Sequence, residues 1–345
     1  MLELWSAEGA FERIEEYLRE RGFFAPGGEE LEASLYLGYG LSDGLRRGAA
    51  PARPEPCPLP HAAVAVAEVA EGQTPGRVRI GQWERTWSEN EYGSAVEAVR
   101  SSIERGDVYQ VNLVQHLSAP CAGDPRALVP LLAPLRPLAP FIAGDGWAIV
   151  SASPELFLGR RGGRVWTMPI KGTRPLGEHV EGEKDEAEHV MIVDLERNDL
   201  SRVCEPGSVR WPELMAEREL AGVTHLVSTV EGRLRDGVGL AELLAATFPG
   251  GSVTGAPKIA ALDEIARLEP VGRGASMGAL GTVRGNGDLD LALTIRTFAV
   301  AVGRIHLWVG GGIVWDSDPD AEIEESWMKA RPLLEAIGAP LESRV

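Results

Sequence analysis

Residues 288–312 read DLDLALTIRTFAVAVGRIHLWVGGG, and this stretch decides the fold class. From its start, leucine and isoleucine alternate with polar or small side chains, which is the two-residue period of a strand with one buried face. Gly303 marks a turn, and the alternation resumes after it. The stretch therefore predicts two long antiparallel strands, 288–299 and 304–310, joined by a short turn.

Segments on either side of this pair have the 3.6-residue period of amphipathic helices or the alternation of shorter strands. The C-terminal helix has a clear start signal, because Asp318 is a good N-cap and Pro319 suits the first helical position. We predict helices over 8–24, 90–105, 183–198, 257–268 and from Pro319 through Ile337, and further strands over 108–117, 147–151 and 164–170. Long antiparallel strands mixed with helices predict an α+β fold in which helices cover sheets.

A proline-rich stretch, PARPEPCPLP at 51–60, is suited neither to a helix nor to a central strand. We interpret it as a connector between a small N-terminal region and the main body. The predicted organisation is a short N-terminal region at 1–80, integrated with the core, and a main domain at 85–340.

Composition excludes several classes of protein. The 345 residues include 34 Lys and Arg against 51 Asp and Glu, so the formal net charge is −17. Such a surface repels phosphate backbones and anionic lipid, and we expect neither a nucleic-acid nor a membrane partner. Three widely spaced cysteines fit reduced thiols, and the N-terminus lacks the pattern of a secretory leader, so we expect a soluble, cytoplasmic protein.

Two predicted helices carry carboxylates where a cation could bind. Glu188 shares a helix face with apolar residues, and an ionised carboxylate there is costly unless it is paired or bound to a cation. Glu322, Glu325 and Lys329 share one stripe of the C-terminal helix. Both patterns have plainer explanations: a tilted helix with Glu188 at its edge near Lys184, and a solvated charged face. If both helices face one cavity, their oxygens suit Mg²⁺.

Three further features suit an anionic substrate. Arg296 lies on the polar face of the predicted strand, where a planar guanidinium can capture a carboxylate; the alternative is a cross-strand ion pair with Asp288, Asp290 or a neighbour. The run Gly310-Gly311-Gly312 permits close approach to the backbone, although glycines also gather at strand ends. Residues 254–258, TGAPK, open a helix whose free N–H groups favour an anion.

Lys171 is predicted where a strand runs into a loop. It is a candidate nucleophile if its pKa is lowered, but an exposed loop lysine is the alternative that its position favours. His225 alternates with apolar residues and fits a buried core histidine. No Ser/His/Asp or Cys/His set emerges from the spacing. The residues alone therefore predict a soluble α+β protein with a candidate site for magnesium and a dicarboxylate.

Eight stretches, taken in order, resemble the chorismate-utilising enzymes, the family of anthranilate synthase component I and aminodeoxychorismate synthase component I. The resemblance is dense from about residue 85 to 335. The stretches are GDVYQVNL (106–113), SASPELFL (151–158), MPIKGTRP (168–175), EHVMIVDLERNDLSRV (188–203), VTHLVSTVEG (223–232), FPGGSVTGAPK (248–258), LALTIRTF (291–298) and GGGIVWDSDPDAEIEESWMKAR (310–331).

The resemblance implies α/β/β/α layers, with two stacked, largely antiparallel sheets flanked by helices and the site between them. It makes 85–340 a chorismate-binding catalytic domain that uses Mg²⁺. By motif position, Glu188 and Glu325 correspond to the metal ligands, with Glu322 adjacent, and Glu155 corresponds to a general acid/base that protonates the leaving hydroxyl. The positions that correspond to substrate-binding groups are Gly172, Thr173, His225, Thr254, Gly255, Arg296, Gly310, Gly311, Gly312 and Lys329.

Two positions discriminate among members of the family. Gln110 stands where water-using members resemble one another in carrying a lysine base, so a neutral amide here favours ammonia as the nucleophile. Lys171 stands in PIKGT, where anthranilate synthases typically have alanine; this form is similar to aminodeoxychorismate synthase, whose lysine adds to C2 of the ring before ammonia adds at C4. The resemblance thus implies synthesis of 4-amino-4-deoxychorismate for p-aminobenzoate and folate. A separate glutamine amidotransferase subunit would supply the ammonia.

Two alternatives accompany this interpretation. Anthranilate synthase component I, which serves tryptophan biosynthesis, is the alternative enzyme. Ser276 replaces a tyrosine of the family's substrate pocket, and this departure motivates a third hypothesis, a relative that binds chorismate without catalysis.

Overall fold

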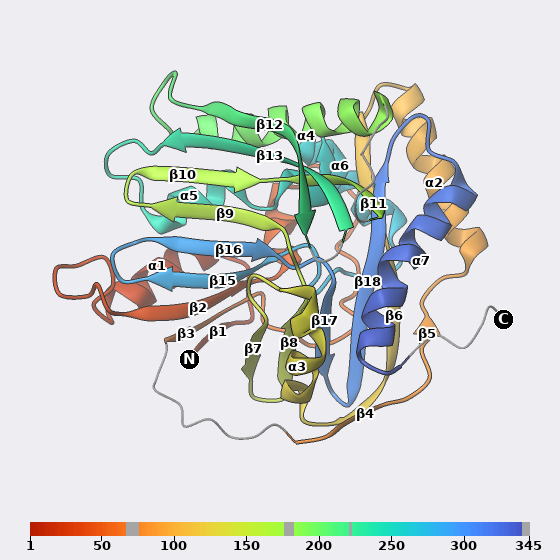
Figure 1. The fold of residues 1–345 in the computed structure, drawn as a ribbon, viewed down its shortest axis with the longest axis horizontal. Helices are drawn as coiled ribbons and strands as arrows, with labels where there is room; N and C mark the ends of the chain where they lie inside the picture. Colours follow the sequence, from red (N-terminus) through yellow and green to blue (C-terminus); the bar gives the residue numbers. More distant parts are fainter. Residues whose placement is uncertain (67–75, 176–182, 221–222, 340–345) are drawn as a thin grey trace.

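A computed structural model describes residues 1–66, 76–175, 183–220 and 223–339, and these residues form two antiparallel sheets with helices around them (Figure 1). Helices α1 and α5 pack against the larger sheet, whereas α2 and α7 cover the strands β6 and β18 of the smaller one. The predicted α+β class is confirmed.

In the described ranges, ten strands form the larger sheet in the order β1-β3-β2-β15-β16-β9-β10-β13-β11, with β12 paired to β13. The N-terminal strands lie inside it, because β2 pairs with β15 and places Leu37 opposite Ala279. The strands are β1 (Leu2–Leu4), β2 (Glu32–Leu37), β3 (Ala62–Val66), β9 (Leu156–Arg161), β10 (Arg164–Met168), β11 (Ile170–Pro175), β12 (Arg210–Leu220), β13 (Val223–Arg233), β15 (Ala279–Arg284) and β16 (Leu289–Leu293).

The smaller sheet has eight described strands, in the order β14-β6-β18-β17-β8-β7, with β4 and β5 paired to β6. Its longest pairing joins β6 to β18, in register from Arg304 opposite Pro120 to Ile313 opposite Val111. The strands are β4 (Val78–Ile80), β5 (Glu84–Arg85), β6 (Gln110–Gly123), β7 (Phe141–Gly144), β8 (Trp147–Ser151), β14 (Gly255–Ala256), β17 (Thr297–Ala301) and β18 (Arg304–Ile313).

The helices follow local signals in the chain. At α2 a capping box forms, since Ser88 accepts from the Glu91 backbone and Glu91 reaches back to Ser88. At α7 the Asp318 side chain accepts from the backbone N–H of Ala321 at 3.0 Å. The α-helices are α1 (Ala10–Arg19), α2 (Glu89–Glu104), α3 (Leu128–Leu132), α4 (Glu183–Ser201), α5 (Leu240–Thr247), α6 (Lys258–Leu268) and α7 (Pro319–Ala336), and the 3₁₀ helices are η1 (Tyr39–Leu45), η2 (Pro125–Ala127), η3 (Ala133–Leu135) and η4 (Gly251–Val253). No helix in the described ranges is both long enough and apolar enough to cross a bilayer.

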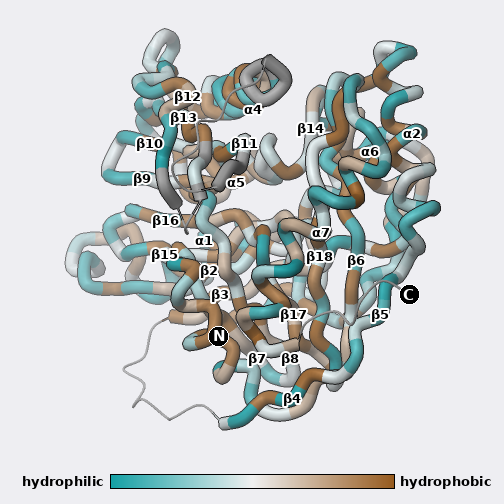
Figure 2. Tube along the Cα trace, turned by 45° about the vertical axis from the view of Figure 1, so that its right-hand side comes forward, coloured by the Kyte–Doolittle hydropathy of each residue, from teal (hydrophilic) through white to brown (hydrophobic). Residues whose placement is uncertain are grey.

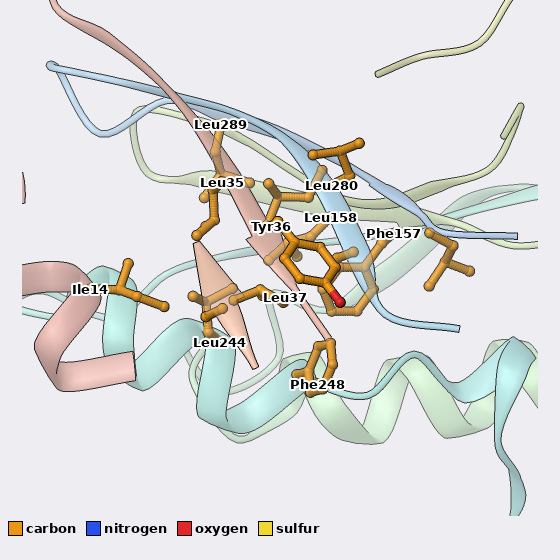
Figure 3. Close-up of a cluster of buried hydrophobic side chains, with 14 of the residues drawn as sticks. Ile14, Leu35, Tyr36, Leu37, Phe157, Leu158, Leu244, Phe248, Leu280 and Leu289 are labelled. Atoms are coloured by element: carbon orange, nitrogen blue, oxygen red, sulfur yellow. The ribbon is translucent and has the colours of Figure 1, made fainter. Parts of the chain in front are cut away.

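The largest hydrophobic cluster joins the helices to both sheets. Ile14 of α1 and Leu244 of α5 lie under Leu35 and Leu289 of the larger sheet (Figure 3). Tyr36 of β2 meets Trp147 of β8 with ring centroids 6.1 Å apart, so the sheets also pack on each other. Figure 2 shows the strongest hydrophobic colouring around β2 and β3, and hydrophilic colouring in the outer loops. Burial of apolar surface on both sides of the larger sheet is the main stabilising contribution.

The predicted strand 288–299 is wrong as a single element. Its first half is β16 in the larger sheet and its second half is β17 in the smaller one, and residues 294–296 cross between them. Arg296 has φ of 50°, a left-handed conformation that interrupts the pleat. Thr294 stabilises this crossing segment, because its hydroxyl donates to the carbonyl of Ala275 at 2.5 Å. β17 is buried at all five positions, so the sequence pattern does not reveal that the chain changes sheets here.

Candidate active site

Three elements bring together Lys171 of β11, Glu188 of α4 and Gln110 of β6. The Lys171 Nζ lies 2.5 Å from Glu188 Oε1, and the Gln110 side-chain amide donates to the same oxygen. The side chains of Lys171 and Glu188 are only 14% and 12% exposed. The alternative of an exposed loop lysine is therefore wrong, since Lys171 lies on a strand and is buried against an acidic helix.

The glycine run at the end of β18 lets acidic side chains approach the strand from two helices. A Cβ atom on Gly312 would lie 2.5 Å from Glu188 Oε1 and would overlap the Gln110 amide. A Cβ on Gly311 would lie 3.2 Å from Glu325 Oε1 and 3.4 Å from Glu322 Oε2. A side chain at 312 would thus force the ends of Gln110 and Glu188 to shift, and the carboxylates of α4 and α7 lie against consecutive residues of one strand.

The carboxylates of α7 have different surroundings. Glu322 is buried and accepts a hydrogen bond from the Ser317 hydroxyl at 2.6 Å. Glu325 is 46% exposed and pairs with Lys329 at 2.7 Å. Lys329 Nζ also donates to the carbonyl of Gly310 at 2.8 Å. The stripe predicted on this helix is therefore partly buried against β18, rather than wholly solvated.

The charge on Lys171 reflects this convergence. Burial acts to lower the pKa of Lys171, but Glu188, Glu155 and Glu325 act in the opposite direction, and the net result is a raised pKa. Lys171 is therefore an ammonium group in this structure, at a point where carboxylates from separate elements meet.

The donor set fits a magnesium ion in part. Among the residues that the structure describes, no group of three or more His, Cys, Asp or Glu side chains is arranged to hold a metal by itself. Mg²⁺ typically takes only one or two protein carboxylates and fills its other positions with water and substrate oxygens. Glu188 and Glu325, with Glu322 beside them, supply the one or two carboxylates that such an ion needs.

Glu155 lies just before β9, on the same side as Lys171. Its carboxyl is 5% exposed and accepts from the Ser252 hydroxyl at 2.7 Å and from the backbone N–H of Ile170 at 3.5 Å. Burial raises the pKa of Glu155, and the Ser252 hydrogen bond and the Lys171 charge only partly oppose it. A carboxyl whose pKa is raised in this way is suited to general-acid chemistry.

Arg296 does not occupy the position predicted for it, because it lies at the crossing between the sheets and not within a strand. Burial lowers the pKa of its guanidinium, whereas nearby Glu155 raises it. The alternative of an ion pair with Asp290 is wrong, since Asp290 pairs with Arg161 at 2.7 Å and with Arg284 at 2.8 Å. Among the described residues Arg296 forms no salt bridge, and Glu155 acts on its guanidinium only through the charge interaction, so the guanidinium can serve a bound carboxylate.

The 254–258 segment is held beside Gln110 by strand pairing. Gly255 has φ of 128° and pairs with Val111, and a side chain there would strike the carbonyl oxygen of Gln110. Thr254 is buried, and its hydroxyl donates to the Gly250 carbonyl at 2.9 Å. Lys258 is not available to an anion, since its Nζ is engaged by Asp199 at 2.5 Å and by backbone carbonyls.

Two predicted residues cannot be placed by their side chains. Thr173 and His225 lie on β11 and β13, but their side chains fall outside the part of the chain that the structure describes. Gly172, between Lys171 and Thr173, has φ of 61°. Ser252 was not singled out from the sequence, although this residue lies inside the quoted stretch 248–258. The signal available in the sequence was a serine that directly follows two glycines, Gly250 and Gly251.

Comparisons with known proteins agree with this geometry. A family model described as chorismate binding enzyme matches residues 45–335. Anthranilate synthase component 1 of Streptomyces coelicolor is 39% identical over 91% of this chain and 62% of its own length. Aminodeoxychorismate synthase component 1 of Klebsiella aerogenes is 42% identical over 73% of this chain and 59% of its own length. The chain thus spans about 60% of these relatives. Among solved structures, anthranilate synthase component I of Streptococcus pneumoniae superposes with a TM-score of 0.77 at 26% identity, covering 92% of this chain and 84% of that one.

Proposed function

Because the chain belongs to the chorismate-binding enzyme family, we propose that it converts chorismate and ammonia into 4-amino-4-deoxychorismate. The observation that carries this proposal is the position of Lys171, buried beside Glu188 and Gln110 at the end of β18. Relatives named aminodeoxychorismate synthase component 1 support it, and relatives named anthranilate synthase component 1 make that enzyme the second candidate.

In the proposed reaction Lys171 attacks as a neutral amine, so before the cycle it separates from Glu188 and releases one proton to solvent; it leaves C2 as a neutral amine at the end. Its nitrogen then bonds to C2 of the ring, the double bonds shift, and the C4–O bond breaks. Glu155 supplies a proton to the departing hydroxyl, which leaves as water. Ammonia bonds to C4, the bond between C2 and Lys171 breaks, and the proton shed by the new amine returns to Glu155.

The remaining residues have positioning roles in this proposal. Arg296 holds a carboxylate of the substrate, and the backbone of Gly310–Gly312 lets the ring approach β18. Gln110 cannot act as a base, which favours ammonia over water. When bound by Glu188 and Glu325, Mg²⁺ would supply Lewis-acid stabilisation of the charge that develops on the substrate. A glutamine amidotransferase partner would supply the ammonia, and the product would serve p-aminobenzoate and folate synthesis.

The test is product identification with chorismate, Mg²⁺ and an ammonium salt, by mass and by conversion with the downstream lyase. We expect aminodeoxychorismate from the natural protein and none from K171A. The matched variant K171R keeps the positive charge beside Glu188 but cannot act as the nucleophile. Loss of product in both variants supports the covalent route, whereas substantial product from K171R would contradict it. Anthranilate as the sole product would favour the second candidate, and chorismate binding without turnover would favour a non-catalytic relative.

A further inference from the structure

A second buried carboxyl group, Glu196, lies behind the proposed site. It extends from α4 and is 6% exposed, and it accepts a hydrogen bond from the Thr167 hydroxyl at 2.8 Å. The cavity that it lines together with Thr167, Asp199 and Thr247 measures only about 10 Å³. So small a space has room for about one water molecule, which is too few to hydrate a charged carboxylate.

Glu196 and Glu155 are held by interlocking contacts. Ser252 donates to Glu155, while a Cβ on its neighbour Gly251 would lie 3.5 Å from Glu196 Cγ. Thr167 donates to Glu196, while its neighbour Met168 pairs with Leu156, which follows Glu155. Ser252, which binds Glu155, is thus adjacent in the chain to Gly251, which lies against Glu196. Thr167, which binds Glu196, is likewise adjacent to Met168, which pairs with the residue after Glu155.

The nearby charges favour a neutral Glu196. Asp199 is the next acidic side chain on α4, and the one lysine facing it among the described residues, Lys258, is engaged by Asp199 and by two backbone carbonyls. Lys171 and Arg296 face Glu155 instead. Burial raises the pKa of Glu196, and the charges of Glu155 and Asp199 raise it further, whereas the Thr167 hydrogen bond lowers it. The net result is a pKa of about 8.

We propose that Glu196 is a positioning residue that holds a proton beside Glu155 and thereby lets Glu155 give its own proton to the departing hydroxyl. The inference rests on the proposed function, which makes Glu155 the general acid. With Glu196 neutral, proton donation by Glu155 leaves one carboxylate charge in this dry region. With Glu196 ionised, the same step would leave two charges close together, which is strongly disfavoured.

The consequence is a coupled titration. Either carboxyl can lose the first proton, so the pair loses it at a lower pH than Glu155 would alone. In E196Q the neighbour stays neutral at every pH, and the glutamine oxygen can still accept from Thr167. We expect the alkaline limb of kcat/KM against pH to move upward in E196Q, by ~0.3 pH unit for two groups of equal acidity and by more if Glu196 is the stronger acid.

The experiment compares the pH profiles of the natural protein, E196Q and D194N with infrared spectra at pH 7. Asp194 lies on the same helix, is 68% exposed and pairs with Arg197, so D194N removes a carboxylate without touching the pair. We expect the carbonyl band of protonated carboxyls to lose the contribution of one group in E196Q and to keep its full intensity in D194N. An unchanged band, or an unchanged alkaline limb in folded, active E196Q, would overturn the inference.

A second variant, T167V, covers the case in which E196Q does not fold. It removes the hydrogen bond that favours ionised Glu196, so the alkaline limb should again move upward; an unmoved limb counts against the inference. Failure of the proposed function is a separate result. It appears as a wrong product from the natural protein, and the infrared band still reports whether Glu196 carries a proton.

Discussion

Two buried histidines between β6 and β18 should make the folded protein sensitive to mild acid. His116 and His306 are 5% and 2% exposed, and their rings stack with centroids 5.3 Å apart. Nε2 of His116 lies 3.0 Å from Nδ1 of His306, and Thr86 bonds the other nitrogen of His116. Burial, together with the charge of Arg304, lowers the pKa of His116 to about 3 and that of His306 to about 4, and His306 also contributes to the lowered pKa of His116.

The sign and size of the effect follow from linkage. Both folded pKa values lie below the unfolded value of about 6.5, so the unfolded chain takes up protons first as the pH falls. The stabilising contribution is present above about pH 6.5 and is lost progressively below it. At pH 5.5 each histidine contributes a loss of about 1.4 kcal/mol in the free energy of unfolding, or about 3 kcal/mol for the pair.

The assay measures urea unfolding by tryptophan fluorescence at pH 7.5 and 5.5, for the natural protein and the H116Q/H306Q double variant. A comparison is needed because Glu55 and Glu196, with pKa values raised to about 7 and about 8, stabilise the fold as the pH falls and so act in the opposite sense. We expect the natural protein to lose about 3 kcal/mol relative to the variant between the two pH values. Equal pH dependence in both proteins would refute the reasoning.

Three further predictions test the site and its support. G312A should lose activity by at least tenfold, because its methyl group would displace Glu188 and Gln110. The control G163A, whose added methyl group would have no atom within 4 Å, should be as active as the natural protein in the same assay. Comparable activity of the two variants would contradict the packing argument. E269Q should lower the free energy of unfolding by about 3–5 kcal/mol, since Glu269 neutralises the fully buried Arg273; a loss below 1 kcal/mol by urea unfolding would count against it. Chelation of divalent cations should abolish turnover, and added Mg²⁺ should restore it. Calorimetry should show that E188Q binds Mg²⁺ at least tenfold more weakly than the natural protein. Unchanged Mg²⁺ binding by E188Q would remove Glu188 from the ligand set.

Local signals were sufficient to predict the helices. The predicted helix 90–105 became α2, Glu89–Glu104, because its capping box and apolar stripe are encoded within a few residues. The C-terminal helix begins where Asp318 and Pro319 place it. The α+β class followed from the same local patterns.

Long-range pairing could not be derived from local patterns. Lys171 is buried because β11 pairs with β13, at Leu226, and because α4 brings Glu188 to its side chain. Neither contact has a signature in the sequence around Lys171, so the local sequence favours an exposed loop lysine at this position. Arg296 was misplaced for a related reason, since a period of two does not show which sheet a strand joins.

The family resemblance, rather than periodicity, identified the residues that converge at β18. Spacing alone left open whether Glu188 and Glu325 were helix-surface carboxylates or ligands of a cation. The structure adds the physical reason for their approach, which is the absence of side chains at Gly311 and Gly312.

The pairing of β2 with β15 has a consequence for synthesis of the chain. About 240 residues separate Leu37 from its partner Ala279. At a translation rate of about 5–20 residues per second, the ribosome needs roughly 10–50 s to produce β15 after β2 has been made. During that interval one edge of β2 has no native neighbour, and such an edge readily joins strands of other chains. We therefore expect the nascent protein to depend on chaperones until β15, about four-fifths of the way along the chain, has emerged.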